Sequence, residues 1–108
     1  MAKPFRIKRN DLSRSIKWYP RASPATNYTG ATAVFNMRFK DGSTKINRAT
    51  ATIGNDADGT FLQYDWAGTD TDTAGDFEAE FEATLSSGKP ETTPNDGFIW
   101  VKIDEDIA

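Results

Sequence analysis

Residues 76–85 alternate strictly between apolar and polar side chains, and this pattern constrains the fold more than any other part of the chain. The apolar positions are Phe77, Ala79, Phe81, Ala83 and Leu85. The polar positions are Asp76, Glu78, Glu80, Glu82 and Thr84. A period of two places successive side chains on opposite faces of a β-strand. The sequence therefore predicts a strand with one buried face and one acidic face.

Further strand-like segments occur along the chain, separated by residues that favour turns. We expect strands at residues 5–9, 13–19, 31–39, 44–53, 60–66, 89–93 and 98–103. Turns rich in Gly, Asn, Asp and Ser are expected at residues 27–30, 40–43, 54–59, 86–88 and 94–97. No segment has the apolar spacing and caps of a helix. This organisation predicts an all-β fold, with a small closed barrel as the alternative to a β-sandwich.

The residues that begin the alternating strand favour an immunoglobulin-like β-sandwich of about seven or eight antiparallel strands. In such sandwiches an aromatic residue follows a turn at the start of strand F, as Phe77 follows Gly75 here. Ala79 stands where antibody domains have a cysteine, and the chain has no cysteine, so no disulfide is expected. We expect one domain over residues 1–108, with residues 1–4 and 104–108 as tails that are loose or ordered by a partner.

The composition removes several kinds of chemistry. The chain has no histidine and no cysteine, so it lacks the usual general base near neutral pH and the commonest metal ligands. The remaining acid–base candidates are Glu78, Glu80 and Glu82, which lie two residues apart on one strand face. Such a row is also the ordinary solvent side of a strand. We therefore expect no enzymatic activity and no cofactor.

Acidic turns raise the possibility of calcium, which takes six to eight oxygen ligands. The candidate ligands are Asp56, Asp58, Asp70, Asp72 and Asp76. Their spacing does not match an EF-hand loop, and no helices flank them. Because turns favour Asp for its local hydrogen bonds, we expect no metal site.

Charge is distributed unevenly along the sequence. Residues 1–45 contain ten Lys or Arg and two acidic residues, whereas the remainder contains three basic and fourteen acidic residues, for a net charge of -3. Such a chain can dock on a neighbour of opposite charge, including a second copy of itself. The alternative is that the two sets of charges interleave in the folded sheet and cancel.

We predict a protein–protein interface that uses basic and aromatic residues of the first strands and the acidic row. Its candidate residues are Phe5, Arg6, Lys8, Arg9, Arg14, Lys17, Tyr19, Glu78, Glu80 and Glu82. The overall acidity argues against nucleic acid as the partner. No apolar run approaches the ~20 residues of a membrane span, and the first residues lack the apolar segment of a signal peptide. We therefore expect neither a nucleic-acid nor a membrane partner.

Three large aromatic residues could form either a contact patch or part of the core. They are Tyr64, Trp66 and Trp100. Aromatic side chains often anchor interfaces, but a small sandwich can also bury them. We expect at least two of the three in the core.

The order of several segments resembles the N-terminal domain of tailed-bacteriophage baseplate upper proteins, and small phage proteins of similar length. The matching segments are residues 5–11 (FRIKRND), 28–38 (YTGATAVFNMR), 58–66 (DGTFLQYDW), 72–82 (DTAGDFEAEFE) and 92–103 (TTPNDGFIWVKI). Together they extend over nearly the whole chain.

The resemblance implies a non-enzymatic β-sandwich of the virion. Members of this family act as adaptors in the tail, baseplate or neck and attach fibres or receptor-binding proteins. Its partners would be other virion proteins, in a homo-oligomer or symmetric assembly on the particle. One alternative is a capsid decoration (cement) protein. An alternative of another class is a carbohydrate-binding or adhesive sandwich with Trp66 or Trp100 as a stacking platform.

Overall fold

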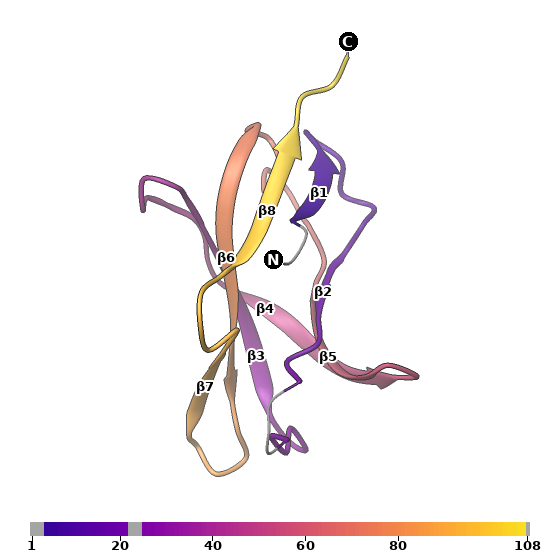
Figure 1. The fold of residues 1–108 in the computed structure, drawn as a ribbon, viewed down its shortest axis with the longest axis vertical. Coiled ribbons are helices and arrows are strands. Elements are labelled where there is room, and N and C mark those ends of the chain that lie inside the picture. The colour runs from indigo at the N-terminus through magenta and orange to yellow at the C-terminus, as the bar shows by residue number, and fades with distance from the viewer. Residues whose placement is uncertain (1–3, 22–24, 108) are drawn as a thin grey trace.

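The computed structural model describes residues 4–21 and 25–107, and within these ranges the chain forms strands, turns and loops without a helix (Figure 1). The all-β expectation is therefore confirmed. The strands are β1 (Phe5–Lys8), β2 (Ile16–Trp18), β3 (Thr32–Phe39), β4 (Thr44–Asp56), β5 (Gly59–Tyr64), β6 (Gly75–Thr84), β7 (Pro90–Thr93) and β8 (Ile99–Asp104).

The strands pair in one continuous order from β1 to β2, on both sides of the core. The order is β1-β8-β6-β3-β4-β5-β2, and β7 pairs with the end of β6. The 13-residue β4 pairs with β3 through residues 44–51 and with β5 through residues 52–56. β4 therefore carries the sheet from β3, β6 and β8 to β5 and β2, and the two edges are left to β1 and β2.

β6 lies near the middle of this order and has the predicted two-faced character. Phe77, Ala79, Phe81 and Ala83 are each at most 1% exposed. Leu85, beyond the end of the strand, is half-buried. β3 pairs with β6 from Phe77 to Thr84 on one side, while β8 and β7 share the other side. β6 is thus flanked by strands on both sides, and its apolar face lies in the core.

The expectation that all strands are antiparallel is wrong for β1, which runs parallel to β8. Phe5 pairs with Val101, and Lys8 pairs with Asp104. A tight turn forces consecutive strands to be antiparallel, but these two strands come from opposite ends of the sequence. Their relative direction is set by packing, which apolar–polar alternation does not encode.

Several expected boundaries also change; for example, the strand expected at residues 13–19 is limited to Ile16–Trp18. Asp56 pairs with Gly59, so only Ala57 and Asp58 connect β4 to β5, rather than residues 54–59. Asp104 is the last residue of β8 and its carbonyl accepts a hydrogen bond from the Arg9 N–H, so it is not part of a loose tail. Residues 1–3 and 108 of the expected tails lie outside the described residues.

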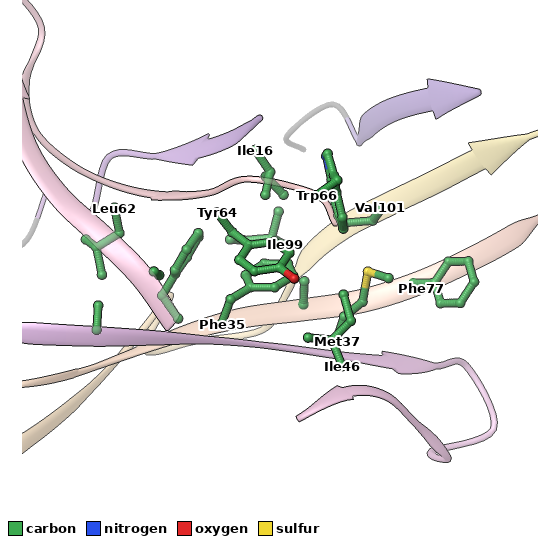
Figure 2. Packing of buried hydrophobic residues seen from close by; sticks show 14 of the residues in the cluster. Ile16, Phe35, Met37, Ile46, Leu62, Tyr64, Trp66, Phe77, Ile99 and Val101 are labelled. Atoms are coloured by element: carbon green, nitrogen blue, oxygen red, sulfur yellow. The ribbon is translucent and has the colours of Figure 1, made fainter. Parts of the chain in front are cut away.

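Aromatic rings fill the centre of the core (Figure 2). Phe35 of β3 is fully buried and stacks on Tyr64 of β5, with ring centroids 4.6 Å apart and planes 8° apart. The Trp66 ring meets the Phe35 ring edge to face, with centroids 5.7 Å apart. The Phe81 ring of β6 has its centroid 5.0 Å from that of Phe35. Tyr64 and Trp66 are 6% and 4% exposed, so at least two of the three large aromatics are in the core, as predicted.

Replacing the central ring tests this description. Phe35→Ala should lower the free energy of unfolding by about 3–5 kcal/mol, because it removes apolar contacts and leaves a cavity between β3, β5 and β6. Leu12→Ala is the matched control, since Leu12 is 42% exposed and should change stability by less than about 0.5 kcal/mol. Urea unfolding followed by tryptophan fluorescence measures both. Equal losses in the two variants would contradict the proposed centre of the core.

Candidate interaction surfaces

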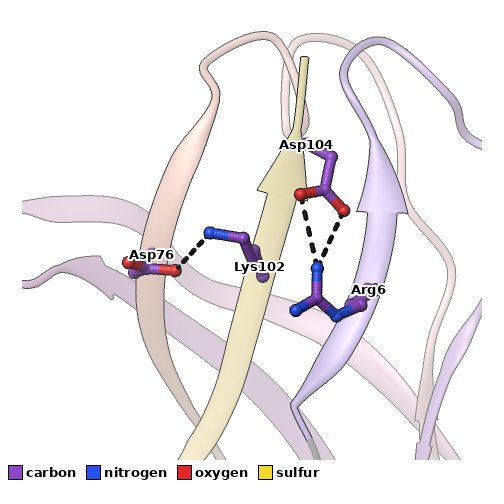
Figure 3. A network of polar contacts seen from close by, with 4 residues as sticks. All are labelled: Arg6, Asp76, Lys102 and Asp104. Atoms are coloured by element: carbon purple, nitrogen blue, oxygen red, sulfur yellow. Dashed lines mark hydrogen bonds and ion pairs between the residues drawn. The ribbon is translucent and has the colours of Figure 1, made fainter. Parts of the chain in front are cut away.

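The predicted interface residues of β1 lie at an edge of the sheet. Phe5 turns inward and its ring lies 5.8 Å from that of Trp66, so it supports the core more than it offers a contact surface. Arg6 and Lys8 alternate with the buried Ile7 and are exposed. Arg6 Nη1 lies 3.4 Å from both carboxylate oxygens of Asp104 (Figure 3). The edge of β1 therefore presents cations beside the end of β8.

A surface hollow of about 230 Å³ lies beside this edge. It is lined by Arg6, Ile7, Lys8, Asp11, Arg14 and Asp104, and we call it the basic-edge hollow. Its three cations outnumber its two carboxylates. Within residues 4–21 and 25–107, Lys8 and Arg14 form no ion pair. The hollow thus has uncompensated positive charge.

Arg9 follows β1 but is directed to the C-terminal segment. Its Nε lies 3.2 Å from Glu105 Oε1, and both side chains are well exposed. Exposed pairs of this kind contribute little to stability. The pair does reduce the charge that Arg9 can offer to a partner.

Lys17 and Tyr19 belong to a different cluster, at the β4–β5 hairpin. Tyr19 Oη donates a 2.5 Å hydrogen bond to Asp56 Oδ2, and Lys17 Nζ lies 3.5 Å from the same oxygen. Lys17 also lies 4.1 Å from the centre of the Phe61 ring. That ring covers Gly54, where an added Cβ would come within 2.7 Å of it. The predicted interface residues Lys17 and Tyr19 are therefore engaged in contacts inside the domain.

Two glutamates of the acidic row of β6 form ion pairs with arginines of β3 and β4. Glu78 Oε1 lies 2.7 Å from Arg38 Nε of β3, and Glu82 Oε1 lies 2.5 Å from Arg48 Nη1 of β4. Glu80 forms no ion pair among the residues that the structure describes. The row and the basic first strands are thus not brought together, and much of the uneven charge interleaves and cancels inside one molecule.

A second hollow, of about 220 Å³, opens on the outer face of β3, β4 and β6. Its polar lining consists of Asn36, Arg38, Thr44, Asn47, Glu78 and Glu80, and we call it the outer-face hollow. Phe98 forms part of its wall and is 38% exposed. Trp100, 40% exposed, follows on β8 opposite Glu78.

Sequence reasoning identifies Glu78, Glu80 and Trp100 as surface candidates but misses the other residues of this face. A signal for Phe98 exists, because Ile99, Val101 and Ile103 are apolar at every second position and leave residues 98 and 100 for the other face. The same period of two marks Asn36, because Ala33, Phe35 and Met37 are buried and leave residue 36 for the other face. No comparable signal marks Asn47, whose place depends on an irregularity of β4 that only the fold reveals.

The acidic turns are occupied by internal contacts. Asp70 Oδ2 accepts hydrogen bonds from Tyr64 Oη at 2.5 Å and from the Ala67 N–H at 2.9 Å. Asp72 Oδ1 lies 2.5 Å from Lys45 Nζ. No group of three or more acidic side chains in the described part of the chain is arranged to hold a metal ion. These carboxylates serve to fix loops onto the sheet.

Among the described residues there is no helix with the length and apolar character needed to cross a membrane. Comparisons with protein-family models, with curated proteins and with solved structures gave no match.

The Tyr19–Asp56 hydrogen bond predicts a dependence of stability on pH. This bond lowers the pKa of Asp56 below 3.8 and raises the pKa of Tyr19 to about 12. A lowered folded-state pKa contributes stability that is present above the unfolded value and lost as pH falls. A raised folded-state pKa contributes stability that is present below pH 10.0 and lost as pH rises toward about 12.

Tyr19→Phe removes this bond and leaves the ring against Phe61. The difference in unfolding free energy between the native chain and this variant should be largest between about pH 5 and 9 and shrink at both extremes. Urea unfolding at pH 3, 7 and 11 measures it. A difference that stays constant over this range would show that the bond does not form in solution.

Proposed function

We propose that this chain is a non-enzymatic structural module of a bacteriophage virion, an adaptor in the tail, baseplate or neck that attaches fibres or receptor-binding proteins. The observation that carries the proposal is the basic-edge hollow, where Lys8 and Arg14 form no ion pair within the described chain. Unpaired, accessible cations at a sheet edge suit an acidic surface on a neighbouring protein. The resemblance of the ordered sequence segments to baseplate upper proteins supports a virion as the setting.

We further propose that the fold is an immunoglobulin-like sandwich without its disulfide. In that fold strands B, E and D form one sheet, and strands C, F and G form the other. β2, β5 and the second half of β4 follow the first order, and β3, β6 and β8 follow the second. The stacking of Phe35 on Tyr64 joins the two sides of a chain without cysteine, whereas antibody domains link strands B and F by a disulfide. Strand order and packing both support this assignment.

The fold leaves only one of the two tryptophans named for the carbohydrate-binding alternative on the surface. Trp66 is 4% exposed and packed among aromatic rings, so it cannot serve as a stacking platform on the surface. Trp100 remains available, because two fifths of its surface is exposed. A glycan-binding role would therefore depend on the outer face of β8.

The virion proposal is tested by particle composition and by charge reversal. We expect the chain in purified particles of the phage that encodes it, as density in a cryo-EM map of the tail, baseplate or neck. Replacing Lys8 and Arg14 together by Glu should reduce incorporation at least about tenfold, because each lost charge contact at an interface costs on the order of 1–2 kcal/mol.

Lys89→Glu is the matched control, since Lys89 is exposed, lies at the β6–β7 turn and forms no ion pair among the described residues. It reverses one charge, half the change made by the double substitution, at a place away from the basic-edge hollow. Absence of the chain from purified particles would refute the virion role. Density on the capsid alone would favour the decoration protein, and equal incorporation of both variants would refute the basic-edge hollow as the docking surface.

A further inference from the structure

We propose that the outer-face hollow binds a neutral sugar ring, as one unit of a glycan that continues over Trp100. This site lies on a different surface from the basic-edge hollow and does not depend on the virion role. The inference rests on four properties of the outer face: exposed aromatic rings, free hydrogen-bonding groups, a lining without an unpaired cation and a size suited to one ring.

Aromatic rings line the path that such a glycan would follow. Phe98 forms one wall of the hollow, and Trp100 lies in register with Glu78 on the next strand. The two side chains are 38% and 40% exposed, although burial of large aromatics is the ordinary outcome in a domain core. The C–H faces of a sugar ring are apolar and pack on such rings. These two exposed rings, two residues apart in the chain, are the surface on which the proposed glycan would pack.

The hollow also offers hydrogen-bonding groups of both kinds. The Asn36 Oδ1 accepts a 2.7 Å bond from the Arg48 N–H, which leaves the Asn36 Nδ2 group to donate. Glu80 forms no ion pair among the described residues and can accept. Sugar hydroxyls donate and accept at once, so a mixture of amide, hydroxyl and carboxylate groups matches them. Asn47 and Thr44 extend this mixture on β4.

The charged side chains that line the hollow favour a neutral ligand. Arg38 Nε lies 2.7 Å from Glu78 Oε1, and the Arg38 guanidinium also lies over the Phe98 ring at 4.7 Å. This cation is therefore occupied, while Glu80 adds negative charge to the hollow. Inside the hollow, an anionic ring such as sialic acid would meet the Glu80 carboxylate, and the only cation of the lining, Arg38, is paired with Glu78. Lys40, whose Nζ lies 5.8 Å from the centre of the Trp100 ring, is not part of this lining. A neutral hexose meets no such repulsion.

The shape follows from an irregularity of β4. Phe35 pairs with Ala49 and Met37 pairs with Ile46, so β4 has one residue more than β3 over this interval. Arg48 takes a φ of 53° there. Such a bulge bends the strand and redirects side chains. The resulting volume of about 220 Å³ lies below the ~300 Å³ of the smallest drug-sized pockets, which suits one ring.

The proposal is tested on an array of neutral and sialylated oligosaccharides, followed by NMR titration of the isotope-labelled protein with the neutral glycans that bind. We expect binding to neutral glycans, with chemical-shift changes centred on Asn36, Glu80 and Phe98. Phe98→Ala and Trp100→Ala should each weaken binding at least about tenfold, whereas Leu12→Ala, which changes an exposed apolar residue elsewhere, should not.

Glu80→Ala provides a second variant that leaves the aromatic rings in place. It should weaken binding severalfold while the NMR spectrum stays that of the folded protein. No binding on the array, binding restricted to sialylated glycans, or binding that survives both aromatic substitutions would overturn the proposal. The Lys8 and Arg14 double substitution should leave glycan binding unchanged, which separates this site from the proposed assembly surface.

Discussion

The stacking of Phe35 on Tyr64 is the contact on which the two sides of the structure depend. Phe35 comes from β3 and Tyr64 from the end of β5, and their rings are nearly parallel at 4.6 Å. Trp66, from the loop after β5, and Phe81, from β6, pack against Phe35. Aromatic rings from β3, β5, β6 and the β5–β6 loop therefore lie together in the core. Burial of large rings supplies much of the hydrophobic stabilisation in a small domain. Here it does so in a chain that has no cysteine to link its sides.

Many charged side chains of the described residues form ion pairs within the domain, and some of these pairs join adjacent strands. Arg38 with Glu78 and Lys102 with Asp76 each connect adjacent strands across the outer face. Because ion pairs engage more than half of the described Lys and Arg side chains, the unpaired ones are the cations available to a partner. Lys8 and Arg14 concentrate positive charge at one edge, whereas the outer-face hollow is lined by a paired arginine and by Glu80, which forms no ion pair among the described residues. Two surfaces with different chemistry thus arise on one small sheet.

The sequence predicts the parts of the fold that depend on neighbouring residues. Period-two alternation places the buried face of β6 correctly, because a strand fixes its side-chain directions locally. For Trp100 the sequence left both a core and a surface position open, and the structure places it on the surface. The parallel pairing of β1 with β8 depends on residues at opposite ends of the chain, which no local pattern encodes. The same applies to the outer-face hollow, whose shape comes from the pairing of Phe35 and Met37 with a bulged β4. Charge pairing was also underdetermined, since composition does not say which carboxylate Lys17 reaches.

The parallel pairing of β1 with β8 has a mechanical consequence. The chain enters β1 at Phe5, opposite Val101, and leaves β8 at Asp104, opposite Lys8. A tensile force applied between the segments before and after this pair would slide the two strands along each other. Their hydrogen bonds would then carry the load together, in shear, rather than open one after another as in an unzipped hairpin. The domain is therefore built to resist stretching along the direction of these strands.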